Sequence, residues 1–268
     1  MKPRPLQVDT AGQGEPLVLI PGGLTGWLSW IPHQERLSDR YRTIRVQPIH
    51  NELGSAGMPG DPSYTWDVAV ESLLLTIDHL EIERAHFAGW SAGGKGLLDF
   101  AIAHSTRLIS MTLIEPAAYW VLDVVGEPDL EHEESTRFLR QLAGGEVTED
   151  DLARFLYLAG FVGDPARARS DSYWERAWPH RMALSWLAEK LMGSDHTIEA
   201  LKVVNCPVLL TKGTETGEWE KRVVDALGRH LPNARVVEFE GSHAHHIENM
   251  DRFLDALDGH LQTSTSDR

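Results

Sequence analysis

The stretch Gly89-Trp90-Ser91-Ala92-Gly93 reads G-x-S-x-G and decides the fold that this sequence predicts. A short apolar run at 85–88 precedes it, and the residues from Leu97 to Ile102 that follow repeat their apolar positions at helical spacing. A turn this tight between a strand and a helix needs small residues around the serine, because larger side chains would collide. The stretch therefore predicts a turn that presents the Ser91 hydroxyl at the end of a sheet.

Strand-like and helix-like patterns alternate along the rest of the chain. Apolar runs predict strands at 17–20, 43–46, 85–88, 108–114, 207–211 and 235–239, and helical periodicity predicts helices at 27–37, 66–80, 223–231 and 249–261. The last residues, 262–268, are polar, and we expect them to be disordered. This alternation predicts an α/β fold with a mostly parallel, doubly wound sheet covered on both faces.

The alternation stops in one long segment. Residues 117–200 contain helix-like stretches and no convincing strand, and they hold four of the nine tryptophans, Trp120, Trp174, Trp178 and Trp186. We expect this segment to be a helical cap over the strand ends, with 1–116 and 201–268 forming the core. Trp174 or Trp178 is expected to touch a ligand, which favours an apolar or aromatic substrate.

Composition limits the partners of the protein. A formal charge of −15 argues against a nucleic acid or an anionic membrane as a partner. The single cysteine, Cys206, permits no intrachain disulfide and favours a reducing compartment. The first residues contain no apolar core of a signal peptide, and no apolar run is long enough to span a membrane. We therefore expect a cytoplasmic protein; its oligomeric state is not indicated.

A serine nucleophile needs a base, and His243 is the candidate. It lies in Gly241-Ser242-His243-Ala244-His245-His246, after the last predicted strand. Three histidines within four residues could instead bind a metal, but no H-E-x-x-H motif or cysteine accompanies them, so packing roles are expected for His245 and His246 and no metal is expected. His50, in a predicted loop after a strand, could line the pocket.

Backbone amides are the candidates for binding an oxyanion. One is Ala92, directly after the nucleophile, and the other is Gly23 in the loop Pro21-Gly22-Gly23-Leu24, where glycines let the backbone approach a substrate closely. Leu24 and Trp90, which adjoin these two positions, are candidate substrate contacts.

Four segments together resemble the α/β-hydrolase fold family: 19–23, 89–94, 113–116 and 241–244, which read Leu-Ile-Pro-Gly-Gly, Gly-Trp-Ser-Ala-Gly-Gly, Leu-Ile-Glu-Pro and Gly-Ser-His-Ala. The resemblance covers nearly the whole chain, and the order of serine, acid and histidine is that of the family. It implies a sheet of eight strands, here shortened at its N-terminal edge, a helical cap after the sixth strand, and a Ser-His-acid triad.

The chain departs from the family pattern at two places. The family usually has His-Gly where this chain has Pro21-Gly22, and the usual acid lies in a Gly-x-x-Asp pattern where this chain reads Gly213-Thr214-Glu215-Thr216. Two glutamates could replace the acid. Glu215 is one residue early, whereas Glu115 lies 24 positions after Ser91, where the similar zearalenone lactonases take their acid. We favour Glu115, expected in an extended conformation before Pro116, and keep Glu215 as the alternative.

The resemblance implies acyl transfer without a cofactor: Ser91 attacks a small ester or lactone, His243 acts as the base, and the acid orients His243. Two alternatives remain open. One is a cofactor-free lyase or perhydrolase that uses the same triad, and the other is a ligand-binding protein of this fold without catalytic activity.

Overall fold

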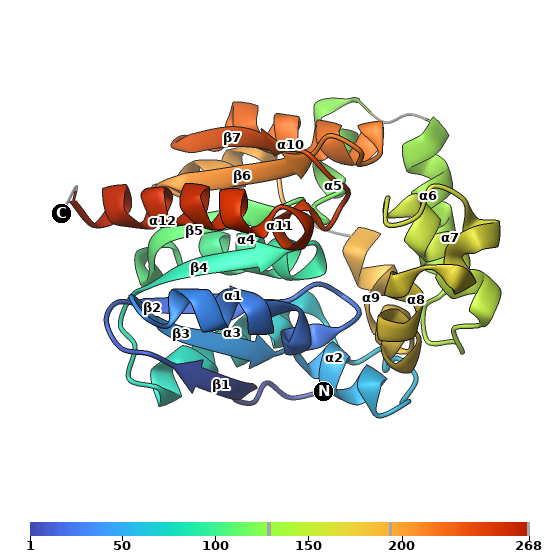
Figure 1. Ribbon diagram of the computed structural model, residues 1–268, viewed down its shortest axis with the longest axis horizontal. Helices are drawn as coiled ribbons and strands as arrows, with labels where there is room; N and C mark the ends of the chain where they lie inside the picture. Colours follow the sequence, from blue (N-terminus) through green and yellow to red (C-terminus); the bar gives the residue numbers. More distant parts are fainter. Residues whose placement is uncertain (128–129, 193–194, 267–268) are drawn as a thin grey trace.

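A seven-stranded sheet forms the centre of the computed structural model, which describes residues 1–127, 130–192 and 195–266. Its strands are β1 (Gln7–Ala11), β2 (Pro16–Ile20), β3 (Arg42–Gln47), β4 (Ala85–Trp90), β5 (Leu108–Ile114), β6 (Val208–Gly213) and β7 (Ala234–Phe239). They lie in the order β1-β3-β2-β4-β5-β6-β7, and all neighbours are parallel except β1 with β3 (Figure 1). The α/β class and the mostly parallel sheet predicted from the sequence are confirmed, with seven strands rather than eight.

Helices cover both faces of the sheet (Figure 1). One face carries η1 (Gly26–Trp30), α1 (Ile31–Leu37), α11 (His245–Glu248) and α12 (Met250–Ser266); the other carries α3 (Trp66–His79), α4 (Ala92–Ala103) and α10 (Glu218–His230), with η2 (Ser105–Arg107) after α4. Alternate residues of β2 supply both cores: Leu17 and Leu19 pack in the first, Val18 and Ile20 in the second. Every residue of β4 and β5 is buried, which explains the apolar runs.

Three local expectations differ from the structure. Strand β1 was not expected, because it is a half-exposed edge strand with little apolar character. Helix α2 (Ile49–Ser55) begins directly after Pro48, so His50 lies in a helix and not in a loop. Helix α12 continues to Ser266 beyond the predicted end at 261, since Thr265 Oγ1 donates a hydrogen bond to Glu15 and holds the helix end against the core. Residues 267–268 lie outside the described residues.

The described part of 117–200 contains helices and no strand: α5 (Trp120–Val125), α6 (Leu130–Gln141), α7 (Glu149–Leu158), η3 (Pro165–Ser170), α8 (Ser172–Ala177), η4 (Trp178–His180), α9 (Ala183–Met192) and the start of η5 (Ile198–Val203). Helices α6 to α9 lie beyond the ends of the parallel strands (Figure 1).

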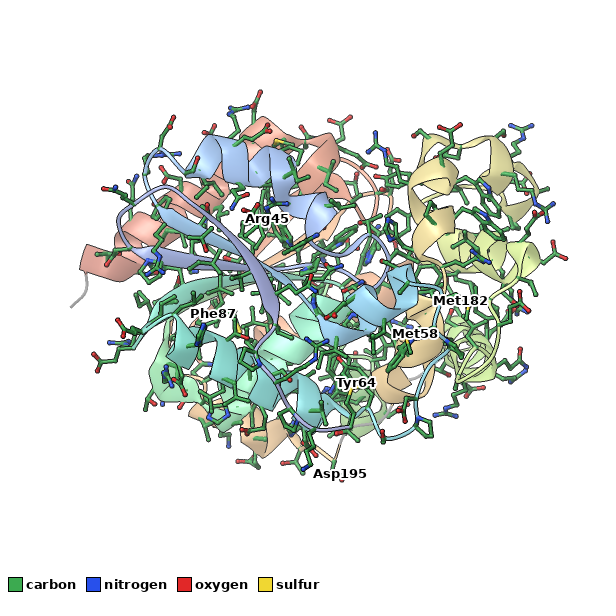
Figure 2. All side chains as sticks on the ribbon, turned by 90° about the horizontal axis from the view of Figure 1, so that it is seen from below. Arg45, Met58, Tyr64, Phe87, Met182 and Asp195 are labelled. Carbon is green, nitrogen blue, oxygen red and sulfur yellow. The ribbon has the colours of Figure 1, made fainter. Side chains whose placement is uncertain are left out.

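Helix α9 attaches this segment to the core. A Cβ on Gly54 of α2 would lie 2.4 Å from the backbone of Ala183, so the two helices touch through their backbones. The Trp186 indole donates a 2.9 Å hydrogen bond to the carbonyl of Met58, and Figure 2 labels Met58 and Met182 at this junction. Among the described helices, none combines the length and the hydropathy that crossing a lipid bilayer requires.

Candidate active site

The turn between β4 and α4 holds Ser91 in a strained conformation, with φ 54° and ψ −118°. The glycines on both sides are required by close backbone contacts. A Cβ on Gly93 would lie 2.3 Å from the Pro21 carbonyl oxygen, and one on Gly89 would lie 2.8 Å from the Gly93 oxygen. Hydrogen bonds fix the turn, because the Ser91 amide donates to the Ile114 carbonyl at 2.9 Å. The serine is therefore held at the carboxyl end of the central strand.

Ser91 lines a cavity of about 310 Å³ between the core and residues 155–180. Core residues such as Gly23, Leu24 and Trp90 form one side, and Phe161 and Tyr173 are among those that form the other. Most of the remaining lining is apolar, with Glu175, Arg176 and His180 as the charged or titratable members. Within the described part of the chain, the Ser91 hydroxyl makes no hydrogen bond of its own.

The two candidate oxyanion-binding residues, Gly23 and Ala92, lie close together. Ala92 is the first residue of α4, so its N–H has no acceptor within the helix. A Cβ built on Gly23 would lie 3.7 Å from the Ala92 Cβ and 2.7 Å from Cδ1 of Leu187 in α9, so a larger residue here would require the end of the Leu187 side chain to shift. The Asn51 side chain donates to the carbonyls on either side of Gly23, those of Gly22 and Leu24, at 3.3 Å each, which holds this loop in place.

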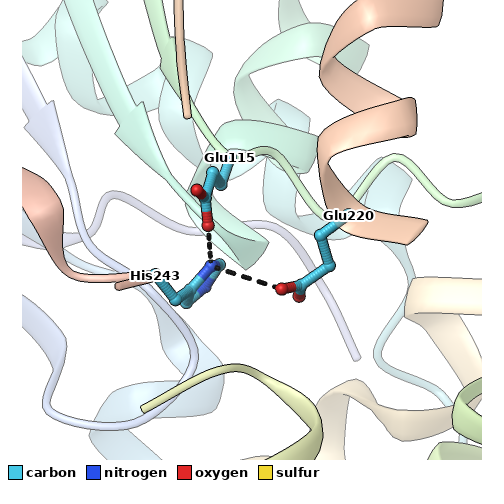
Figure 3. Close-up of side chains that lie close together, drawn as sticks. All are labelled: Glu115, Glu220 and His243. Carbon is cyan, nitrogen blue, oxygen red and sulfur yellow. Dashed lines mark hydrogen bonds and ion pairs between the residues drawn. The ribbon is translucent and has the colours of Figure 1, made fainter. Parts of the chain in front are cut away.

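The loop after β7 brings His243 against Glu115, which follows β5 (Figure 3). The His243 Nδ1–H donates a short hydrogen bond to Glu115 Oε2, and the two side chains are 3% and 1% exposed. Glu115 Oε1 accepts hydrogen bonds from the Gly213 amide at 2.6 Å and from Thr216 Oγ1 at 2.7 Å. Thr216, which occupies the place expected for an aspartate, thus serves as a donor to the glutamate.

The backbone of Glu115 corrects one expectation. Its φ is +39°, in the left-handed region, and not in the extended region expected before Pro116. Several contacts hold this conformation: the Glu115 amide donates to the Thr211 carbonyl at 3.1 Å, and the carboxylate accepts the donors described above. Pro116 also packs closely on α4, where a Cβ on Gly94 would lie 3.0 Å from it. Tertiary contacts outweigh the local preference at this residue.

Glu215, the alternative acid, lies at the surface. Its side chain is exposed, and its amide donates to the Gly241 carbonyl at 2.9 Å. In the described ranges, its carboxylate makes no hydrogen bond to a histidine. The structure thus places Glu115, and not Glu215, beside His243.

Sequence reasoning missed a second buried carboxyl near His243. Glu220 of α10 is 4% exposed, and its Oε2 lies 4.0 Å from His243 Nδ1 (Figure 3). A signal for it exists in the sequence, because Glu220, Val223 and Leu227 share one helix face. The ligand atoms of Glu115, Glu220 and His243 lie within 4.8 Å of one another and could hold a metal ion, but Nδ1 is already engaged by Glu115.

These groups shift one another's pKa values. Burial alone would raise the pKa of Glu115, but the hydrogen bond and charge of His243 hold it below its ordinary value. Burial alone would lower the pKa of His243, but the neighbouring Glu220 and Glu115 carboxyls raise it. Burial raises the pKa of Glu220 to about 8. Glu115 therefore carries its charge at neutral pH, and the ionisation of Glu220 is linked to the protonation of His243.

The other two histidines of this loop pack against neighbours. The His245 ring stacks on Phe239 at 5.5 Å, and its Nε2 lies 2.9 Å from Thr211 Oγ1. The His246 ring lies 4.5 Å from that of Trp90, and neither of its nitrogens has a hydrogen-bond partner in the described part of the chain. Both side chains are fully buried.

Three other candidate contacts lie outside the lining of this cavity. His50 is buried, with its Nδ1 3.0 Å from the Tyr64 hydroxyl, and it borders a separate hollow of about 30 Å³. Trp174 and Trp178 stack on each other at 5.5 Å, and the Arg181 guanidinium lies 3.9 Å from the Trp178 ring. Ligand contact by these three residues stays a prediction, whereas Leu24 and Trp90 do line the cavity.

Comparison with known proteins agrees with this fold. A family model described as "Alpha/beta hydrolase family" matches residues 17–256 of this chain. The chain therefore belongs to the alpha/beta hydrolase family, and the hydrolase and esterase names of its relatives support an enzyme of this class.

Particular relatives differ in how much of their length is matched. The 2-hydroxymuconate semialdehyde hydrolase of Pseudomonas sp. (strain CF600) is 34% identical over 110 residues, which are 40% of this chain and only 38% of that protein. The pimeloyl-[acyl-carrier protein] methyl ester esterase of Aeromonas hydrophila subsp. hydrophila is 26% identical over 94% of this chain and 98% of its own length. The enol-lactonase structure from Burkholderia xenovorans LB400 has a TM-score of 0.67 at 22% identity, covering 96% of both chains, and shows likeness of fold.

Proposed function

We propose that this protein is a serine hydrolase that cleaves a carboxylic ester or a lactone through an acyl-enzyme on Ser91. The observation that carries the proposal is the buried hydrogen bond between His243 Nδ1 and Glu115, at the end of the sheet where Ser91 lines a cavity. A carboxylate can only accept, so this bond places the proton of neutral His243 on Nδ1 and leaves Nε2 as the basic nitrogen.

The proposed reaction has two halves. Ser91 Oγ attacks the carbonyl carbon while its proton passes to His243 Nε2, and the oxyanion accepts hydrogen bonds from the Gly23 and Ala92 amides. The tetrahedral intermediate collapses, and the leaving alkoxide takes the proton from His243. Water then repeats the sequence on the acyl-enzyme and releases the carboxylic acid and free Ser91.

Glu115 serves this reaction through His243. It holds the imidazole in the required tautomer and stabilises the imidazolium that forms in each half. The Gly213 and Thr216 donors keep Glu115 ionised and fix its direction. The free Ser91 hydroxyl accords with this role, since catalytic hydrogen bonds often form only when substrate is bound.

The lining of the cavity supports an apolar acyl or alcohol group. Leu24, Phe155 and Phe161 are among the residues that surround Ser91, and a volume of about 310 Å³ suits a small substrate. We propose that residues 117–200 act as a lid, because residues 155–180 complete the cavity and Leu187 covers Gly23. The methyl ester esterase named above, matched over nearly its full length, supports ester chemistry.

The test is a panel of p-nitrophenyl esters of increasing chain length and aromatic lactones, assayed with the wild type and Ser91→Ala. Mass spectrometry of the products should show one acid and one alcohol from each ester and one hydroxy acid from each lactone, and the alanine variant should be inactive while still folded. Turnover without release of an acid would favour a lyase or perhydrolase. Saturable binding without turnover would favour a non-catalytic binding protein.

A further inference from the structure

The Nδ1 atom of His243 has two acidic neighbours with opposite environments. Glu115 accepts hydrogen bonds on both carboxylate oxygens. Glu220 Oε2 is buried without a hydrogen-bond partner in the described ranges and lies 4.0 Å from the same His243 Nδ1 (Figure 3). The structure therefore contains one acid that is fully satisfied and one that is not.

An unpartnered buried carboxyl is costly to keep, and its ionised form more so. The groups that face Glu220 are Glu115 after β5, Glu131 of α6, Tyr119 before α5 and His243 after β7. Two of these are acids that disfavour its charge, and Tyr119 is neutral at ordinary pH. His243 is the group among these four whose protonation gives Glu220 a positive partner.

We propose that Glu220 is a positioning residue that acts as the second acidic partner of His243 and stabilises the imidazolium formed when Ser91 gives up its proton. The inference deepens the function proposed above and rests on it. When the Ser91 proton reaches Nε2, the imidazolium lies between the two carboxyl groups, and ionised Glu220 attracts it as Glu115 does, whereas neutral His243 offers Glu220 no such attraction.

This arrangement makes His243 and Glu220 titrate as a pair. The other charged or titratable groups that face His243 are Glu115, Glu248, His245 and His246, and they stay in place when Glu220 alone is replaced. Glu220→Gln keeps the size of the side chain and removes its charge. We expect His243 in this variant to be protonated at a pH about one unit lower, because a partner of its imidazolium is lost.

The experiment is a titration of the His243 ring nitrogens by ¹⁵N NMR in the wild type, Glu220→Gln and Glu218→Gln. The His243 signal is the one absent from His243→Gln. Glu218 is the matched control, because it lies on the same helix with its side chain 80% exposed and pairs with Lys221. The control should leave the titration unchanged. Glu220→Met is the second variant if the glutamine protein does not fold, and the same shift is expected.

The pH profile of kcat/KM supplies the catalytic readout. Glu220→Gln should move its acidic limb down by about one pH unit and lower the plateau of kcat/KM above that limb by up to about tenfold, a change that loosened packing alone would not produce. A His243 titration and an acidic limb identical to those of Glu218→Gln would overturn the proposal. The titration uses no substrate, so failure to find an ester that is hydrolysed counts against the proposed function and leaves the test of Glu220 intact.

Discussion

Replacing Glu115 by glutamine changes one atom of the proposed triad, and the structure dictates how the new amide must lie. The Gly213 N–H, 2.6 Å from Oε1, can only donate a hydrogen bond. The amide oxygen must therefore stay at the Oε1 position, and the NH₂ group takes the Oε2 position against His243 Nδ1. Because NH₂ donates, Nδ1 must become the acceptor and the ring proton must move to Nε2. His243 then presents a proton to Ser91 and cannot accept one.

The size of the effect follows from this change of tautomer. The equivalent Asp→Asn change in the Ser-His-Asp template lowers kcat about ten-thousandfold, which is about 5 kcal/mol of transition-state stabilisation. We expect a loss of this order in Glu115→Gln, with KM little altered because Glu115 does not line the cavity.

The assay is steady-state hydrolysis of the best ester from the panel by Glu115→Gln, with Glu215→Gln as the control. The control removes an exposed carboxylate close in the chain to Thr216 and should keep wild-type activity. Thermal unfolding of each variant shows that any loss is not due to unfolding. Activity of Glu115→Gln within tenfold of the wild type, or a larger loss in Glu215→Gln, would refute the reasoning.

Three further results are expected. His243→Ala should lose hydrolysis while keeping its fold. His246→Ala should mainly lower the melting temperature, because the His246 ring packs against Trp90 in the core. The opposite pattern would show that His246 is the base. The neighbouring acids raise the pKa of His243, and the base must be neutral to accept a proton. We therefore expect kcat/KM to fall on the acid side with a midpoint above about 6.5, the ordinary pKa of histidine. A midpoint well below about 6.5 would contradict this environment of His243. Gly23→Ala places a methyl group 2.7 Å from Cδ1 of Leu187, the end of a flexible side chain, and should lower kcat by less than about tenfold as Leu187 shifts. The double variant with Leu187→Ala should recover the loss, and no recovery would exclude this clash as the cause.

The sequence predicted those parts of the molecule that local chemistry dictates. The G-x-S-x-G stretch predicts the turn at Ser91, because the glycine contacts there are steric requirements. Apolar runs predict the central strands, which are buried on both faces. The threonine at 216 pointed to an acid elsewhere, and the structure brings Glu115 to His243 with Thr216 as its donor.

Other features depend on contacts between distant residues. The positive φ of Glu115 opposes the local preference before proline, and it is held by Thr211, Gly213 and Thr216 from the next strand and its loop. The charge of Glu220 suggests a surface position, although its spacing places it on the buried face of α10. The short helices of 155–180 have no long period from which the sequence could show which aromatic side chains face the cavity.

The central claim is that Ser91 is an activated nucleophile, and labelling with a fluorophosphonate tests it most directly. This reagent forms a stable phosphonyl ester with an activated serine and needs no knowledge of the substrate. Intact-protein mass spectrometry followed by peptide mapping should show a single adduct on Ser91 in the wild type. Ser91→Ala should show none, and Glu115→Gln should react far more slowly. A wild-type protein that stays unlabelled, or an adduct that persists in Ser91→Ala, would contradict the account.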